Sequence, residues 1–243
     1  LVGVARDVSI APIIVGGTAF SILPETILDY LGGDYGVVGE GERAVPELIR
    51  KIAEDRPVSR IVSGRPALEG ADMASPLYDP ELVSYYLKTS DLLNLQTKRG
   101  CPHQCIYCTY PCLEGSAFRT RDPRAVADAV ERLPRDLGVR SLFFTDSVFN
   151  DKRGHYLTVA EELIRRDLKI RWSGFFRPQG LGRKEIALLK RSGLFAMELG
   201  TDASSDATLA EMGKGFTFAD VLGVNRAAVQ ERIPCAHFIM FGG

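Results

Sequence analysis

Four of the chain's five cysteines lie in one short segment, and this bunching is the strongest chemical signal in the sequence. The segment "QTKRGCPHQCIYCTYPCLEG", residues 96–115, spaces them as C-x3-C-x2-C-x3-C. They are Cys101, Cys105, Cys108 and Cys112. Thiolates bind soft metals or pair as disulfides, so three explanations compete: disulfides, a structural zinc site and an iron–sulfur cluster.

The spacing favours the iron–sulfur explanation. Disulfides staple small secreted domains, whereas this chain is long enough for a core and otherwise almost free of cysteine. Structural zinc usually takes two separated pairs of ligands, and His103 is the only other local candidate. A tight thiolate loop can wrap one iron–sulfur cluster. If only Cys101, Cys105 and Cys108 bind, one iron keeps the open position that a catalytic metal needs.

The remaining two cysteines have less defined roles. Cys112 could be a spare ligand, a thiol that handles substrate or a small buried apolar residue. A fourth ligand would close the open iron, so the apolar role is favoured. Cys235 lies inside an apolar strand-like run, "PCAHFIMF", and is expected in the core.

Strand-like and helix-like segments alternate along the chain, which places the cysteines in an α/β fold. Alternation of this kind predicts parallel sheets with right-handed crossovers. Five predicted strands follow in series from about Asn94, enough for an open or partial barrel. In such folds the carboxyl ends of the strands form the working face. Residues 56–93 are rich in Pro, Gly and Ser and are predicted to connect two domains.

Composition narrows the classes of partner. The 243 residues are 45% hydrophobic and 25% charged, with a formal net charge of −1, so no nucleic-acid partner is evident. No run approaches the roughly 18 apolar residues of a membrane segment, and a cytoplasmic location is expected. The chain starts at Leu1 and stops after a strand-like run, so we expect an internal fragment of a longer protein.

"RGCPHQCIYC" resembles the CxxxCxxC signature of the radical S-adenosylmethionine (SAM) superfamily, including the aromatic residue before the third cysteine. "LFFTDSVFN", "GFFRP", "MELGTDASSDATLAEMGKGFT" and "IPCAHFIMFGG" are similar, in order, to the family's later strands. The resemblance implies a radical SAM core over residues 94–243, a partial (β/α) barrel incomplete at its C-terminus. It further implies that Cys101, Cys105 and Cys108 hold a 4Fe–4S cluster whose open iron binds SAM. Reductive cleavage of SAM would then give a 5′-deoxyadenosyl radical.

The same resemblance implies a set of residues around SAM. Tyr107 would lie against the cluster and the adenine, Asp146 and Ser147 would bind the amino group, and Asp202 would meet the ribose. The sequence "TDS" replaces the Gly-Gly-Glu of many members at Asp146 and Ser147. Arg177 would pair with the SAM carboxylate, and Gly242, with its neighbour, would let the backbone approach the adenine. His155 and His237 are expected to be structural.

The N-terminal part resembles the last third of a Rossmann-like cobalamin-binding domain that precedes the barrel in one radical SAM subfamily. "GG" and "GEGE" follow two predicted strands there. Residues 1–55 would therefore be the C-terminal part of that domain, with Gly16, Gly17, Gly39 and Glu40 at the cofactor.

Together, these resemblances imply a radical SAM enzyme, most simply a cobalamin-dependent methyltransferase. Its partners would be a small-molecule or lipid-like substrate and an external flavodoxin- or ferredoxin-type electron donor. The residues identify no catalytic side chain. The alternatives are a radical SAM methylthiotransferase and a non-catalytic iron–sulfur or zinc module. The first needs another cysteine set before the barrel, whereas residues 1–100 contain no cysteine.

Overall fold

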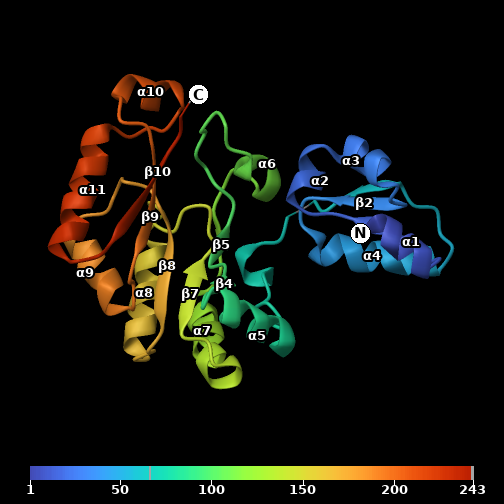
Figure 1. Cartoon of the computed structure of the whole chain (residues 1–243), viewed down its shortest axis with the longest axis horizontal. Coiled ribbons are helices and arrows are strands. Elements are labelled where there is room, and N and C mark those ends of the chain that lie inside the picture. Colours follow the sequence, from blue (N-terminus) through green and yellow to red (C-terminus); the bar gives the residue numbers. More distant parts are fainter. Residues whose placement is uncertain (66, 242–243) are drawn as a thin grey trace. The chain divides into compact units, whose positions relative to one another are not determined.

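The computed structural model describes residues 1–65 and 67–241, so the predicted adenine contact at Gly242 lies outside the described residues. Its contacts divide the chain into two compact units, which are described separately (Figure 1). The first unit comprises Leu1–Leu68 and Thr109–Ala117, and the second comprises Glu69–Cys108 and Phe118–Gly243. The division after Leu68 falls within the predicted connector, residues 56–93. The predicted domain boundaries themselves remain predictions.

The first unit is built on a three-stranded parallel sheet. Its strands are β1 (Ile14–Val15), β2 (Tyr35–Val38) and β3 (Ile61–Ser63), in the spatial order β1-β2-β3. The helices of this unit are α1 (Val2–Val8), α2 (Thr18–Ile22), α3 (Pro24–Leu31), α4 (Gly41–Ala53) and α6 (Tyr110–Glu114). Phe20, Leu28 and Leu48 are the buried apolar side chains that these helices contribute. Helices α2, α3 and α4 pack on β2, the central strand of this sheet.

The second unit is built on a five-stranded parallel sheet (Figure 1). Its strands are β4 (Leu93–Leu95), β7 (Ser141–Phe144), β8 (Arg171–Phe176), β9 (Met197–Asp202) and β10 (Cys235–Ile239). The spatial order is β10-β9-β8-β7-β4, so strands that follow one another in the sheet also follow one another in the chain. A short antiparallel pair, β5 (Lys98–Arg99) with β6 (Arg119–Thr120), lies on either side of the cysteine segment. The five strands in series match the sequence prediction.

Helices connect the strands and pack against one another in sequence. They are η1 (Gly70–Asp72), α5 (Pro80–Thr89), α7 (Pro123–Leu137), α8 (His155–Arg165), α9 (Arg183–Arg191), α10 (Asp206–Glu211) and α11 (Phe218–Gln230). The N-terminus of α7 is capped: the Asp122 side chain accepts the backbone N–H of Arg124, and Pro123 occupies the first helical position. Helix α5 lies in the segment predicted as a connector, where Asp79 caps it in the same way.

The core of the second unit is aromatic at its centre. Trp172 is fully buried, lies 5.2 Å from the ring of Phe144 and 4.8 Å from that of Phe149, and donates its indole N–H to the Ser192 carbonyl. Aliphatic residues of α7, α8 and α9 pack around this group. Cys235 is half-buried and contacts the same core, as predicted. This packing fixes the strands whose carboxyl ends carry the polar residues described next.

Candidate metal centre

The three thiols predicted to hold metal lie in one loop of the second unit. Cys101 is buried, whereas Cys105 and Cys108 are half-buried, and all five cysteines of the chain are free. Burial raises the pKa of the Cys101 thiol, and the neighbouring thiols of Cys108 and Cys105 act in the same direction. Cys112 is exposed, on α6 of the first unit.

A glycine-containing loop, Met212–Phe216, supports the cysteine loop from the side of β9. The backbone N–H of Ile106 donates to the Met212 carbonyl at 3.1 Å. Gly213 has a φ of +69°, and a Cβ there would stand 2.6 Å from the Gln104 carbonyl oxygen. Only glycine permits both this backbone conformation and this approach. The loop therefore fixes the path of the chain between Cys101 and Cys108.

Tyr107, Asp202 and Lys214 form one polar group beside the cysteines. The Tyr107 hydroxyl donates to Asp202 Oδ2 at 2.6 Å, and the Lys214 ammonium contacts the same oxygen and the Tyr107 hydroxyl, the latter at 3.0 Å. Burial and the carboxylate raise the pKa of Tyr107 to about 12, so it stays protonated near neutrality. Although burial favours neutral lysine, the contacts with Asp202 and Tyr107 raise the pKa of Lys214. The group is thus an ion pair bridged by a phenol.

Arg177 follows β8 and brings a second cation to the cysteines. Its Nη1 donates to Cys105 Sγ at 3.8 Å, and its Nη2 donates to the backbone carbonyl of Lys214. The side chain of Asn150 holds the Arg177 backbone. Its Oδ1 accepts the Arg177 N–H and its Nδ2 donates to the Arg177 carbonyl, each at 2.9 Å. Burial, followed by the charge of Arg177, lowers the pKa of His103 to about 4, so that His103 is neutral at pH 7.

Lys98 joins the start of the cysteine segment to the end of β7. Its side chain is fully buried, with Nζ 3.1 Å from Asp146 Oδ2, 3.6 Å from Asp151 Oδ2 and 2.7 Å from the Phe149 carbonyl. Asp146 also accepts the backbone N–H of Thr97 at 2.7 Å and its hydroxyl at 2.5 Å. A buried ion pair with this many hydrogen bonds holds one arrangement strongly once formed.

Asp146 and Ser147, which were predicted to bind SAM, contact the chain just before the cysteine loop. Both oxygens of Asp146 are engaged by Thr97 and Lys98, and the Ser147 hydroxyl donates to the Gly100 carbonyl at 2.8 Å, immediately before Cys101. As placed here, the two residues position the cysteine loop. Their predicted contact with the SAM amino group remains a prediction.

The predicted cofactor residues of the first unit lie at the carboxyl edge of its sheet. Gly16 and Gly17 follow β1, and Gly39 and Glu40 follow the neighbouring strand β2. Gly39 has a φ of +82° and donates its N–H to the Ser21 hydroxyl at 2.9 Å. Glu40 accepts the backbone N–H of Leu68 at 2.8 Å. The structure thus brings these four residues to one edge.

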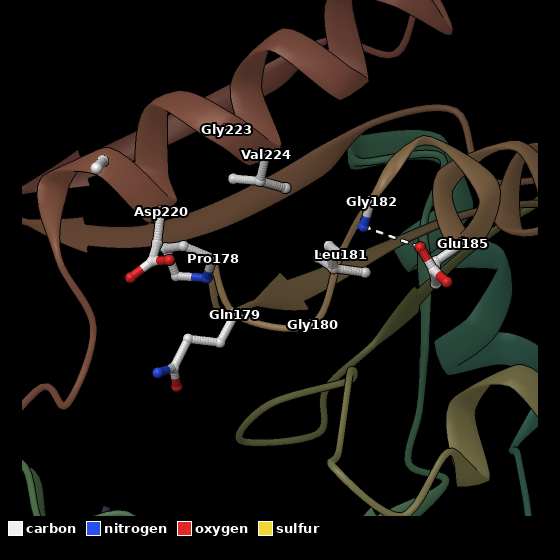
Figure 2. A pocket seen from close by; sticks show the side chains of 10 residues that line it. Pro178, Gln179, Gly180, Leu181, Gly182, Glu185, Asp220, Gly223 and Val224 are labelled. Carbon is white, nitrogen blue, oxygen red and sulfur yellow. Dashed lines mark hydrogen bonds between the residues drawn. The ribbon is translucent and has the colours of Figure 1, made fainter.

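A surface hollow of about 660 Å³ lies beside the loop that follows Arg177, between that loop and the start of α11 (Figure 2). Its two carboxylates already serve as helix caps. Glu185 accepts the Gly182 N–H at 2.9 Å, the contact dashed in Figure 2, and Asp220 accepts the Thr217 N–H at 2.8 Å. No cysteine lines this hollow. Its lining therefore offers shape but no reactive group.

The donor set fits an iron–sulfur cluster better than a single metal ion. Within residues 1–65 and 67–241, no three His, Cys, Asp or Glu side chains converge as a single ion requires. A cubane is larger, and each thiolate would take a different iron corner. Two buried cations beside three thiols suit an anionic cluster, because they offset its charge.

Five parallel strands with helices between them and a thiol loop at their carboxyl edge make the second unit an α/β fold of the partial (β/α)-barrel type. Residues 95–243 match the Radical SAM superfamily. The match covers more than half of the chain, and the chain belongs to this superfamily, whose members bind SAM and a 4Fe–4S cluster. The predicted family and the predicted α/β fold with a partial barrel are confirmed.

Known proteins similar to this chain include methyltransferases and a putative methylthiotransferase. The tryptophan 2-C-methyltransferase of Streptomyces laurentii is 25% identical over 81% of this chain and 44% of its own length. A putative methylthiotransferase of Methanocaldococcus jannaschii is 27% identical over 80% of this chain and 46% of its own length. The radical SAM methyltransferase TsrM of Kitasatospora setae, solved with cobalamin and a [4Fe-4S] cluster, has the same fold, with a TM-score of 0.85 and 24% identity over 99% of this chain and 53% of that one. The chain thus spans about half the length of these relatives.

Sequence reasoning missed three functional neighbours: Lys98, Lys214 and the Met212–Phe216 loop. Lys98 begins the basic segment "KRG", residues 98–100. Neighbouring basic side chains are usually exposed to solvent, yet the Lys98 side chain is fully buried. Lys214 lies in "GKG", whose flanking glycines both have positive φ. Glycines on both sides of a lysine were the one available sign that this loop approaches other backbone closely.

Proposed function

We propose that this chain carries the cofactor-binding core of a cobalamin-dependent radical SAM enzyme that methylates a small-molecule or lipid-like substrate. The observation that carries the proposal is the set of three thiols on one loop, at the carboxyl edge of a barrel that belongs to the radical SAM superfamily. Cys101, Cys105 and Cys108 would hold the 4Fe–4S cluster. When bound and reduced by an external donor, the cluster supplies the electron that cleaves SAM.

The residues around the thiols would orient SAM. Tyr107 and Lys214 both contact Oδ2 of Asp202, and no residue in the described chain donates to its Oδ1. Oδ1 is therefore the acceptor proposed for a ribose hydroxyl. A hydrogen bond to a carboxylate is stronger than one to a neutral acceptor. Tyr107, 44% exposed, would offer its ring to the adenine.

Cobalamin would bind at the carboxyl edge of the three-stranded sheet, against Gly16, Gly17, Gly39 and Glu40. Support comes from the crowding of backbone at this edge: a Cβ on Gly64, after β3, would stand 1.9 Å from the Glu40 carbonyl oxygen. Because no side chain fits at Gly64, this edge presents backbone atoms that a ligand can approach closely. The similar fold of TsrM, which holds cobalamin, supports the same assignment. An external electron donor and a cytoplasmic location complete the proposal. No helix in the described part of the chain is long and apolar enough to cross a membrane.

The test is anaerobic reconstitution of the full chain with iron and sulfide, followed by reduction with dithionite in the presence of SAM. We expect about four irons per chain and formation of 5′-deoxyadenosine. A Cys101→Ser variant should lose both, whereas Cys235→Ser, which changes a core thiol outside the loop, should keep both. Added cobalamin should copurify with the chain and give its visible spectrum. Absence of iron in the wild-type chain would refute the proposal.

A radical SAM methylthiotransferase is the second candidate, since one relative carries that putative name. Such an enzyme needs another cysteine set before the barrel, and residues 1–100 contain none. The two cysteines outside the three-thiol set, Cys112 and Cys235, are too few for a second such set, so about four irons per chain are expected. About eight irons per chain would favour the methylthiotransferase instead.

A further inference from the structure

Arg177 is a buried cation without a carboxylate partner. It is 7% exposed, and no Asp or Glu in the described part of the chain pairs with it. Its Nε–H group is buried and donates to no hydrogen-bond acceptor in the same residues. Because burying an uncompensated charge is unfavourable, a compensating anion is expected nearby. The group within reach is Cys105 Sγ, 3.8 Å from Nη1.

Lys214, the neighbouring cation, is compensated differently. Asp202 neutralises it, and both cations lie over the same ring: the Arg177 Cζ is 5.1 Å and the Lys214 Nζ 5.5 Å from the Phe216 centroid. Since Lys214 already has its carboxylate, the uncompensated positive charge belongs to Arg177. That charge is held rigidly, because Asn150 fixes its backbone and the Lys214 carbonyl accepts from Nη2.

We propose that Arg177 sets the reduction potential of the cluster through its N–H···S contact with Cys105. This inference rests on the proposed function, because it assumes that Cys105 binds the cluster. Reduction adds one electron, taken from the external donor, and so makes the cluster more negative. A desolvated guanidinium stabilises the more negative form, and a hydrogen bond to a ligand sulfur does the same. Arg177 therefore makes the cluster easier to reduce.

The test is a potentiometric titration of the reconstituted full chain, with the reduced cluster counted by electron paramagnetic resonance. In Arg177→Gln, which removes the charge, we expect the ratio of reduced to oxidised cluster at a fixed potential to fall about tenfold, equal to a shift of about 59 mV to lower potential for one electron. Arg177→Lys, which keeps the charge but loses the guanidinium fork, should fall between Arg177→Gln and the wild type.

The matched control is Arg121→Gln. Arg121 is an equally buried guanidinium of the same unit, 5% exposed, and it binds the Gln96 carbonyl and the Ser75 hydroxyl instead of a thiol. Its variant should keep the wild-type potential.

The outcomes separate this inference from the proposed function. If the wild-type chain holds no cluster, the proposed function fails. If the cluster is present and Arg177→Gln retains the wild-type potential, only the inference fails. If Arg177→Gln loses its iron, the Arg177→Lys variant provides the test. A cluster reduction potential below that of the wild type in Arg177→Lys supports the inference, and a wild-type potential overturns it. Loss of iron in both variants, with iron retained in Arg121→Gln, would assign Arg177 a structural role and also overturn the inference.

Discussion

Cys105 lies between two supports that come from distant parts of the chain. The Arg177 guanidinium contacts its sulfur, and the Met212–Phe216 loop packs against the backbone just before it. The thiols could be predicted from the sequence because cysteine spacing is local. Lys98 and Lys214 could not, because their burial depends on Asp146 and Asp202, which are brought close only by the sheet.

The assignment of three ligands, and not four, predicts different outcomes for two single substitutions. Cys105→Ser should reduce bound iron to near zero after desalting, since a cubane held by two thiolates is released easily. Cys112→Ser should keep about four irons per chain, because Cys112 is exposed and outside the three-thiol set. Iron and sulfide assays on both variants check this. Equal loss of iron in the two variants would show that Cys112 is a ligand.

The Glu162 carboxylate, on α8, gives a prediction about pH. Hydrogen bonds from Arg165 and Arg166 lower the pKa of Glu162 to about 2 from an ordinary value near 4.5. Since the folded-state pKa is the lower one, the stabilisation is fully present above about pH 4.5 and is lost as the pH falls towards 2. Carbon-13 NMR of the side-chain carboxyl should show the low pKa, and salt should raise it by screening. Titration of Glu162 near 4.5 would contradict the network.

At the scale of elements, a helix start could be predicted from the sequence where a capping residue precedes a segment with clear helical periodicity. In the sequence, an Asp followed directly by Pro is typical of a helix start. Asp122 and Pro123 form such a pair, and Asp122 caps α7 in the structure. The same pair occurs as Asp79 and Pro80, where it starts α5. That helix was not predicted, because the surrounding segment is rich in Pro, Gly and Ser and α5 buries only Val83. A helix with so narrow an apolar face has weak periodicity.

The loop Met212–Phe216 allows a matched test of its packing against the cysteine loop. Gly213 and Gly215 have nearly the same backbone, with φ of +69° and +65°, but a Cβ would collide with the Gln104 carbonyl only at Gly213. Gly215→Ala should lower the free energy of unfolding by about 1 kcal/mol, because alanine is strained in the left-handed backbone conformation. Gly213→Ala should cost more and should also lower iron retention. Thermal unfolding and iron assays check the pair, and equal effects at both positions would contradict the proposed contact.

At the scale of the whole molecule, the fold class followed from the alternation of strands and helices. Parallel strands need helical crossovers, so the order along the chain indicates the order in the sheet, and the second unit has the series β4, β7, β8, β9 and β10 in that order. The assignment of residues 109–117 to the first unit was not predicted. No sequence pattern marks it, because it depends on contacts between α2 and α6, which are far apart in the chain.

The central claim is that three thiolates hold a cluster with one iron open to SAM. It is tested most directly by electron paramagnetic resonance of the reduced, reconstituted chain before and after SAM is added. We predict that SAM changes the spectrum of the wild-type chain and of Cys112→Ser alike, because SAM binds the open iron in both. A cluster spectrum that SAM leaves unchanged in the wild-type chain would contradict the account.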